Sequence, residues 1–255
     1  MLVRCNCCIR RIGIFVTVLF QTLRKSPKLR LSCYFDTVKM RCYSRYMSYT
    51  NQQQISRSSY HHGDLQRTLL IAAKELIAEH GIENLSLRKL AQRVGVSRTA
   101  AYHHFNDKND LLCAVAAEGF HQRYDFMLSS FNNTNLTDKQ KFDEFICEYI
   151  RYAAQNPEVY ELMFGRCIWK QAKCSQQLKD IAYATFQYQL KMIKHWQKVG
   201  LIIEDDPLRF SQVIWGAMHG IAKLYIDGIY KDAARIEEIS SMAVRLFTAP
   251  LDTQI

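Results

Sequence analysis

Residues 85–111 read LSLRKLAQRVGVSRTAAYHHFNDKNDL, and their pattern predicts two short helices joined by a tight turn, with a third helix beginning directly afterwards. Ser86 is placed to cap the first helix, because a serine oxygen accepts hydrogen bonds from the free amides of a first helical turn. Gly95 supplies a turn position that tolerates positive φ, and Ser97 caps the second helix. The buried face of the first helix is expected to hold Leu87, Leu90, Ala91 and Val94. This is the layout of a helix-turn-helix, whose second helix enters the major groove of DNA.

The second of these helices begins at Arg98 and carries side chains suited to contact with DNA. Arg98 can read guanine O6 and N7 with two hydrogen bonds or pair with a phosphate, and the sequence leaves both roles open. Thr99 and Ala100 are small enough to contact a thymine methyl group. His103 is expected to face the groove or the DNA backbone.

Residues 67–111 contain an ordered set of features: Ala72, Ala73, Leu76, His80 and Gly81, then Gly95-Val96-Ser97, Tyr102-His103-His104-Phe105, Lys108 and Leu111. With this set, the segment resembles the DNA-binding domain of TetR/AcrR-type transcriptional regulators. Farther along, the run from Trp215 to Gly220, WGAMHG, resembles the W…HG signature of the WHG subgroup of ligand domains in that family. Met163-Phe164-Gly165 extends the resemblance, which reaches about Leu246, whereas residues before Tyr60 match nothing in the family.

The resemblance implies an all-α chain in two domains. Residues 60–110 would form a three-helix helix-turn-helix DNA-binding domain, and residues 111–250 a helical bundle for effector binding and dimerisation; residues 1–59 would be an N-terminal extension. The implied function is that of a repressor that binds a palindromic operator in double-stranded DNA as a homodimer and is released by a small effector. An activator of the same fold, or an architectural DNA-binding protein without effector control, remains an alternative.

The same resemblance assigns Tyr102 to a phosphate, because the tyrosine at the matching position in the family donates its hydroxyl there; a place in the core is the alternative. Ser86 and Lys108 each lie at the start of a helix, where a side chain and the free amides together bind one phosphate. The complete predicted DNA-binding set is Ser86, Arg88, Ser97, Arg98, Thr99, Ala100, Tyr102, His103 and Lys108.

Charge and composition agree with a helical protein but do not themselves indicate DNA binding. The chain has 255 residues, 48% of them apolar, with four prolines, and its apolar residues recur at helical spacing. Nearly all of its net charge of +10 arises from residues 1–46, which hold ten of the 34 basic residues and one of the 24 acidic residues. The remainder of the chain is nearly neutral, so DNA binding is predicted from the helix-turn-helix pattern and not from the net charge.

The first 46 residues differ from the rest of the chain. They contain five of the nine cysteines, without the spacing of a zinc site, and an apolar run at Ile12–Phe20 that is shorter than the ~20 residues a membrane helix needs. No convincing signal-peptidase site follows that run. We therefore expect translation of the native protein to begin at Met47 or Met40, with residues 47–59 as a polar arm. The four other cysteines fit free thiols in a reducing cytoplasm.

The sequence predicts neither catalysis nor a cofactor, because no Gly-rich phosphate loop, G-x-S-x-G elbow or H-E-x-x-H motif occurs. Tyr60-His61-His62-Gly63-Asp64 is compatible with a metal site, but we favour Asp64 as the cap of the first helix and the histidines as solvated or close to DNA. No metal and no membrane partner is expected.

The region after residue 137 is rich in aromatic residues at helical spacing. Most aromatic side chains at such positions fill a core, while some are expected to enclose an apolar pocket with few polar groups. His219 lies one helical turn after Trp215 and either bonds a ligand or satisfies a buried neighbour. The predicted pocket for a small apolar or amphipathic effector comprises Tyr152, Phe164, Trp169, Phe186, Trp196, Trp215 and His219.

Helix start signals outline nine helices. Thr137-x-x-Gln140 is a capping box, and Asn156-Pro157 and Asp206-Pro207 each combine a cap with proline at the first helical position. The expected helices are residues 64–80, 86–94, 97–104, 107–130, 137–154, 156–164, 175–199, 206–228 and 232–247. By resemblance, the outer faces of Leu208–Tyr225 and Ile236–Phe247 would pair with a second copy.

Overall fold

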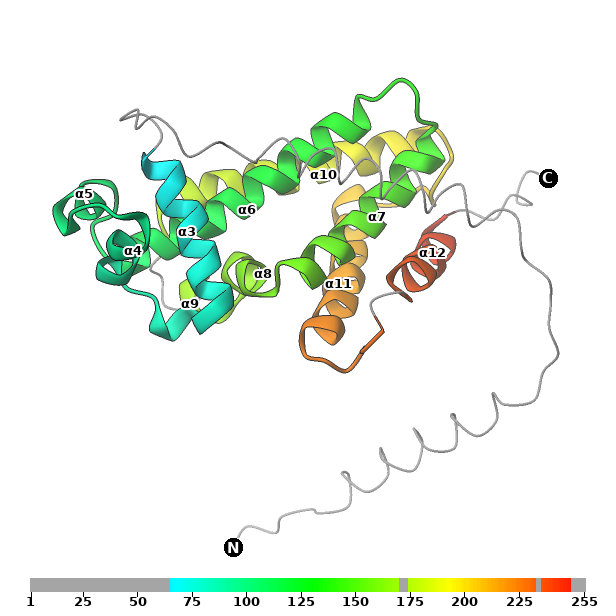
Figure 1. Cartoon of the computed structure of the whole chain (residues 1–255). Helices are drawn as coiled ribbons and strands as arrows, with labels where there is room; N and C mark the ends of the chain where they lie inside the picture. The colour runs from blue at the N-terminus through cyan, green and yellow to red at the C-terminus, as the bar shows by residue number, and fades with distance from the viewer. Residues whose placement is uncertain (1–64, 170–173, 233–234, 249–255) are drawn as a thin grey trace, which may run out of the picture. The chain divides into compact units, whose positions relative to one another are not determined.

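The computed structural model describes residues 65–169, 174–232 and 235–248, and within them it contains α-helices, one turn of 3₁₀-helix and no strand beyond a single bridge between Ile202 and Thr248. The all-α prediction is confirmed. The elements, labelled as in Figure 1, are α3 (Leu65–His80), η1 (Ile82–Asn84), α4 (Leu87–Val94), α5 (Arg98–His104), α6 (Lys108–Phe131), α7 (Asp138–Gln155), α8 (Pro157–Phe164), α9 (Arg166–Trp169), α10 (Gln176–Lys198), α11 (Pro207–Ile226) and α12 (Ile236–Phe247). The predictions for the N-terminal extension, the His61-His62 pair and the Asp64 cap fall outside the described residues.

Each of the nine expected helices has a counterpart, and the one-turn helix α9 was not expected. The last helix begins at Ile236 rather than at Asp232, because the carbonyl of Asp232 accepts the N–H of Arg235 in a turn before the helix starts. Asn156 also departs from prediction. Its side-chain amide donates to the Tyr152 carbonyl at 3.0 Å, at the end of α7, instead of capping α8.

The predicted caps of the helix-turn-helix are confirmed. Ser86 Oγ accepts the N–H of Lys89 at 3.2 Å, and Ser97 Oγ accepts the N–H of Ala100 at 3.1 Å. Gly95, between the two helices, has φ of 78°, a left-handed conformation that costs glycine little and other residues more. Two serines therefore set the starts of α4 and α5, and one glycine sets the end of α4.

The core of α3 to α5 continues into the helices that follow. Leu69, Ile77 and Leu90 are fully buried and belong to one cluster with Leu162 of α8 and Leu178 of α10. Helix α6 begins in this cluster and runs on alongside α10 (Figure 1). The domain boundary at residue 110 remains a prediction, because the apolar core is continuous across it.

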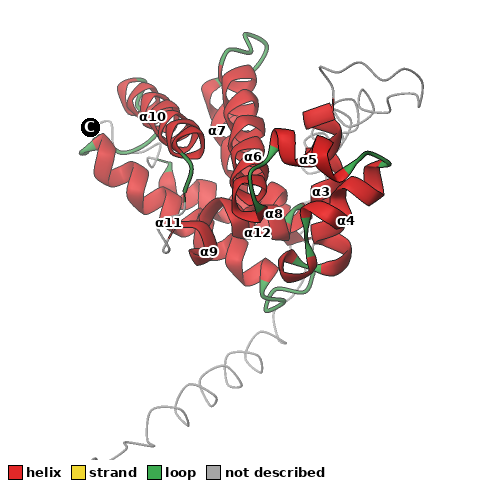
Figure 2. Cartoon of the chain, turned by 90° about the vertical axis from the view of Figure 1, so that its left-hand side faces the viewer, coloured by secondary structure: helices red, strands yellow, loops and turns green. Residues whose placement is uncertain are grey.

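A second cluster holds together the C-terminal helices. Trp196 of α10, Phe145 of α7 and Met218 of α11 are buried in it, with Val244 of α12 packed against them. Helix α7 packs on both α11 and α12, and Figure 2 shows the described residues as helices joined by loops. The chain thus has a head, α3 to α5, and a bundle that begins with α6.

Candidate DNA interface and ligand cavity

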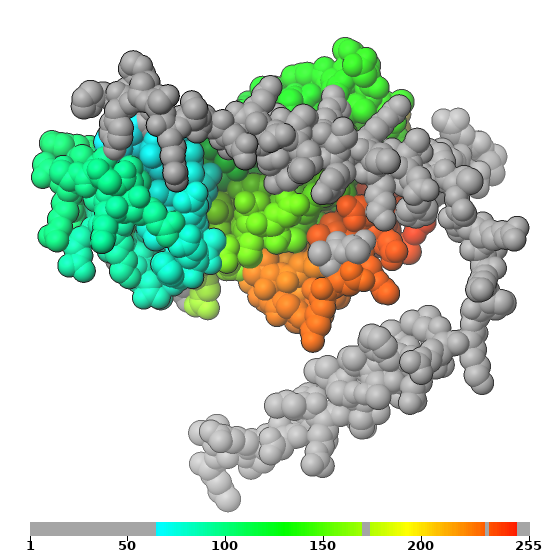
Figure 3. Space-filling model, viewed as in Figure 1, coloured from blue at the N-terminus to red at the C-terminus, as the bar shows by residue number. Residues whose placement is uncertain are grey.

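Helix α5 presents one face to solvent and is held by the other. Ala101 is fully buried and Phe105, just after the helix, is 2% exposed, so both anchor α5 in the head. Arg98, Thr99 and Tyr102 are exposed, and Tyr102 shows 53% of its surface. His103 is exposed beside them, as is Ser97, and Ala100 is half-buried. The space-filling view shows α4 and α5 at the surface of the head (Figure 3). The residues predicted to contact DNA are therefore accessible together.

Helix α4 adds a second set of polar groups next to α5. Arg88 is exposed and borders the same surface hollow as Arg98, together with Gln92. Our prediction did not include Gln92, although it lies one helical turn after Arg88 and shares its exposed face. Amide side chains bind adenine through N6 and N7, so Gln92 extends the candidate interface beyond the predicted residues.

Lys108 begins α6 and is half-buried. Its ammonium donates to the Glu83 carbonyl of η1 at 3.0 Å, which ties η1 to the start of the bundle. An ammonium has three N–H donors, so this bond leaves capacity for a phosphate. Ser86, also half-buried, uses its oxygen lone pair in the helix cap and keeps its hydroxyl proton for donation.

A further arginine of the head has a structural role. Arg93 of α4 pairs with Glu79 of α3 and lies 3.6 Å from Glu75. The hydrogen bond from Arg93 holds the pKa of the Glu79 carboxyl below its usual value. This pair joins α3 to α4, which distinguishes Arg93 from the cations on the exposed face.

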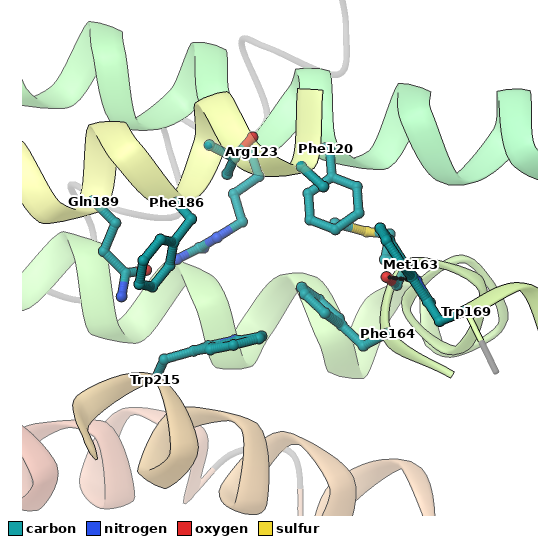
Figure 4. A pocket seen from close by; sticks show the side chains of 10 residues that line it. Phe120, Arg123, Met163, Phe164, Trp169, Phe186, Gln189 and Trp215 are labelled. Atoms are coloured by element: carbon teal, nitrogen blue, oxygen red, sulfur yellow. Dashed lines mark hydrogen bonds between the residues drawn. The ribbon is translucent and has the colours of Figure 1, made fainter. Parts of the chain in front are cut away.

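A cavity of about 280 Å³ lies within the bundle, between α6, α8, α9, α10 and α11 (Figure 4). Its lining is mainly apolar and aromatic: Phe120, Arg123, Met163, Phe164, Trp169, Ala182, Thr185, Phe186, Gln189 and Trp215. Four of the seven residues predicted for a pocket line it, namely Phe164, Trp169, Phe186 and Trp215. Apolar walls with few polar groups are typical of small-molecule sites.

The other three predicted pocket residues lie away from the lining. Trp196 is fully buried and packs edge-on against Phe142, with ring centroids 4.9 Å apart, so it belongs to the second core cluster. Tyr152 lies between the two clusters and reaches Gln122 with its hydroxyl at 3.5 Å. His219 bonds the hydroxyl of Tyr160 through Nδ1. Helical spacing put all three on inward faces but did not distinguish core from cavity.

Arg123 of α6 is the functional candidate that sequence reasoning missed. It is 4% exposed, and its guanidinium lies over the ring of Tyr149, 4.2 Å from the centroid, with Nη1 3.5 Å from Glu148 Oε2. A signal existed in the sequence. Arg123 falls at helical spacing between Phe120 and Met127, on an otherwise apolar stripe, where a charge needs a specific reason.

A chain of hydrogen bonds connects one wall of the cavity to the interior. Trp215 Nε1 donates to the Tyr149 hydroxyl at 3.0 Å. The Tyr149 hydroxyl in turn lies 2.7 Å from the Tyr160 hydroxyl. The Tyr160 hydroxyl lies 2.6 Å from Nδ1 of His219. Burial lowers the pKa of His219 and raises those of both tyrosines, so the network is neutral at ordinary pH. It fixes Trp215 and His219 of α11 against α7 and α8.

The described residues contain no group of three or more His, Cys, Asp or Glu side chains placed to hold a metal ion. No helix in these same ranges is long and apolar enough to cross a membrane.

A helix-turn-helix head with an exposed second helix, followed by a helical bundle with an apolar cavity, defines a class of DNA-binding regulatory proteins. Residues 69–115 match the model of the bacterial regulatory proteins of the tetR family, and residues 142–247 match that of the tetracyclin repressor-like C-terminal domain. The chain belongs to the tetR family. The WHG subgroup remains an expectation from the sequence.

Individual relatives agree with this assignment. The HTH-type transcriptional repressor AcnR of Corynebacterium diphtheriae is 43% identical over 53 residues, which is 21% of this chain and 28% of that protein. The chain therefore matches less than a third of the length of that relative. A solved structure of a protein of unknown function from Rhodococcus sp. RHA1 is 29% identical, with a TM-score of 0.63, covering 76% of this chain and all of that one. A SmeT–triclosan complex has the same fold, with a TM-score of 0.53 at 16% identity, covering 72% of this chain and 91% of that one.

Proposed function

We propose that this protein is a transcriptional repressor that places α5 in the major groove of a DNA operator. The observation that carries the proposal is the geometry of α5, which is anchored by buried Ala101 while Arg98, Thr99 and Tyr102 face solvent. Phosphate contacts from Tyr102 and Lys108 would set the position of the head on DNA, and Arg98 would contribute either base or phosphate contacts. The protein would act in the cytoplasm and carry out no catalysis.

The operator would be palindromic and bound by a homodimer. Helices α11 and α12 expose apolar side chains away from the core: Val213 is 63% exposed, Met242 50% and Leu246 73%. On α11, Val213 lies near two exposed glycines, Gly216 and Gly220, where an added Cβ would meet nothing within 4 Å. Glycines on an exposed helix face allow a second helix to approach closely. Two copies paired there would present two α5 helices to half-sites one helical turn apart.

Control by a small effector would act through α6. Its first residue, Lys108, contacts the head, while Phe120 and Arg123 line the cavity. A ligand that prefers one orientation of α6 would therefore change the spacing of the two heads, and it can shift the balance only by its differential affinity for the two states. The similar fold of the SmeT–triclosan complex supports a ligand role for such a bundle.

The test begins with selection of bound duplexes from a randomised DNA pool, followed by footprinting. We expect protection of one discrete palindrome and a Kd that rises by tenfold or more in Arg98→Ala. Lys194→Ala is the matched control, because Lys194 is exposed on α10, outside the candidate interface. Protection that spreads along any DNA, or equal losses in the two variants, would contradict the proposal.

A further inference from the structure

The cavity holds one charged side chain, and that side chain is incompletely paired. Arg123 has a side chain that is 5% exposed, and its Nη2 is buried without a hydrogen-bond partner. Figure 4 shows the guanidinium pointing into the space bordered by Phe186 and Trp215. A buried donor without a partner is costly, and more so when it carries charge, because it has lost its hydrogen bonds to water and formed none in exchange.

Other side-chain N–H and O–H groups around the cavity are used within the protein. Trp215 Nε1 donates to Tyr149, and Trp169 Nε1 donates to the Met163 carbonyl at 2.7 Å. The remaining donors of the lining also reach backbone carbonyls, Thr185 Oγ1 that of Ile181 and Gln189 Nε2 that of Ser211. Gln189 keeps a second amide N–H, so among the described lining residues the guanidinium of Arg123 is the charged donor left for a ligand.

The carboxylate nearest to Arg123 does not complete its pairing. Glu148 approaches only Nη1, and at 3.5 Å the contact is at the limit of a hydrogen bond. Burial raises the pKa of the Glu148 carboxyl, which weakens its hold as a counter-ion. An arginine fork binds a carboxylate best through two parallel N–H···O bonds, and here one arm of the fork is free.

We propose that the effector of this protein is an organic acid whose carboxylate binds Nη2 of Arg123 and whose compact apolar or aromatic body packs against Phe164, Phe186 and Trp215. The proposal rests on the repressor function above and names its ligand class. The cavity volume, near the lower end of the ~300–1,000 Å³ range of ligand sites, favours a body of one or two rings or a short chain.

The test compares acids with their primary amides, which keep the shape and remove the charge. The probes are naphthylacetate with naphthylacetamide, phenylbutyrate with phenylbutyramide, and octanoate with octanamide. Binding is followed by calorimetry and by tryptophan fluorescence, since Trp169 and Trp215 line the cavity. We expect at least one acid to bind about tenfold or more tightly than its amide, the ratio a charge-assisted hydrogen bond supplies.

Variants assign the preference to Arg123. Arg123→Met should bring the acid-to-amide ratio close to one. Because that change leaves Glu148 buried without its cation, Arg123→Met/Glu148→Gln provides a version that removes both charges. Glu148→Gln alone should tighten acid binding, since it removes the competing carboxylate. Phe186→Leu, a control in the apolar wall, should weaken acid and amide alike.

Each result has a definite meaning. Equal affinities for acid and amide in the unmodified protein, no binding by any acid of the series, or a preference that survives in both Arg123 variants would overturn the inference. Acid binding without loss of operator protection would overturn the effector role. Failure of the unmodified protein to protect a discrete DNA site would instead refute the repressor function, which footprinting without ligand measures separately.

Discussion

The hydroxyl of Tyr160 lies 2.6 Å from Nδ1 of His219 and joins α8 to α11 within the bundle. The same hydroxyl lies 2.7 Å from that of Tyr149, so it is the central member of the buried chain. Tyr160→Phe would leave His219 and Tyr149 each without one partner. We expect the free energy of unfolding to fall by about 1–3 kcal/mol, measured by urea denaturation. Tyr183→Phe is the control, because Tyr183 is 67% exposed, and it should change stability little.

His219 should make stability depend on pH. Burial lowers its folded-state pKa below the ordinary 6.5, so on acidification the unfolded chain takes up a proton that the folded chain does not. The stability from neutral His219 is complete above pH 6.5 and is lost as pH falls from there through the folded-state pKa. We expect His219→Gln to flatten the decline in melting temperature below that pH. An unchanged slope in the variant would mean that other groups cause it.

Tyr102→Phe tests the phosphate role of the tyrosine on α5. The hydroxyl is exposed and the ring remains, so the fold should be unaffected. Phosphate contacts carry no sequence information, so the variant should bind every duplex more weakly by a similar factor, about fivefold, the value of one hydrogen bond. Binding to the selected operator and to a series of single-base variants measures this. Loss confined to one base position would instead show that Tyr102 reads a base.

Gly119 allows α6 and α8 to cross closely beside the cavity. A Cβ on Gly119 would lie 3.0 Å from both the Tyr152 hydroxyl and Val159 Cγ1, and 2.5 Å from Met163 Sδ. Gly119→Ala should therefore destabilise the protein by about 1–3 kcal/mol, as overpacking does. It should also alter ligand affinity, since Met163 lines the cavity. The control Gly216→Ala lies on the proposed dimer face, so it is compared in a monomeric background. There nothing lies within 4 Å of the added Cβ, and helix propensity predicts a gain of about 0.5–1 kcal/mol.

The proposed dimer face can be tested by charge. Val213→Asp and Leu246→Glu replace exposed apolar side chains, so each monomer should stay folded while pairing is lost. We expect a halved mass in light scattering and a loss of operator affinity of about a hundredfold or more, because only one half-site is then held. Tyr183→Asp places the same charge on an exposed side chain of α10 and should leave both quantities unchanged. A monomeric unmodified protein at micromolar concentration would contradict the dimer proposal.

Local signals in the sequence predicted the helices well. Ser86, Ser97 and Thr137 each cap a helix where expected, because an N-cap interacts with amides only two or three residues away. The prediction that Asn156 caps α8 was wrong for a related reason. An asparagine between two helices can bond to either of them, and here its side chain donates to the carbonyl of Tyr152 in the preceding helix. Helix α9 is a single turn, too short for a periodic pattern to reveal.

The sequence by itself determined the all-α fold, the helix-turn-helix and the exposed residues of α5, because caps, turns and helical periodicity depend on neighbours a few residues apart. Only the tertiary structure separated Trp196, in the core, from Trp215, at the cavity. It alone also brought Arg123 over Tyr149 with one arm of its guanidinium unpaired. These relationships join residues of α6, α7, α10 and α11 that are separated by many positions along the chain. Periodicity shows which face of a helix turns inward, whereas the packing of whole helices decides whether that face meets another side chain or an open space.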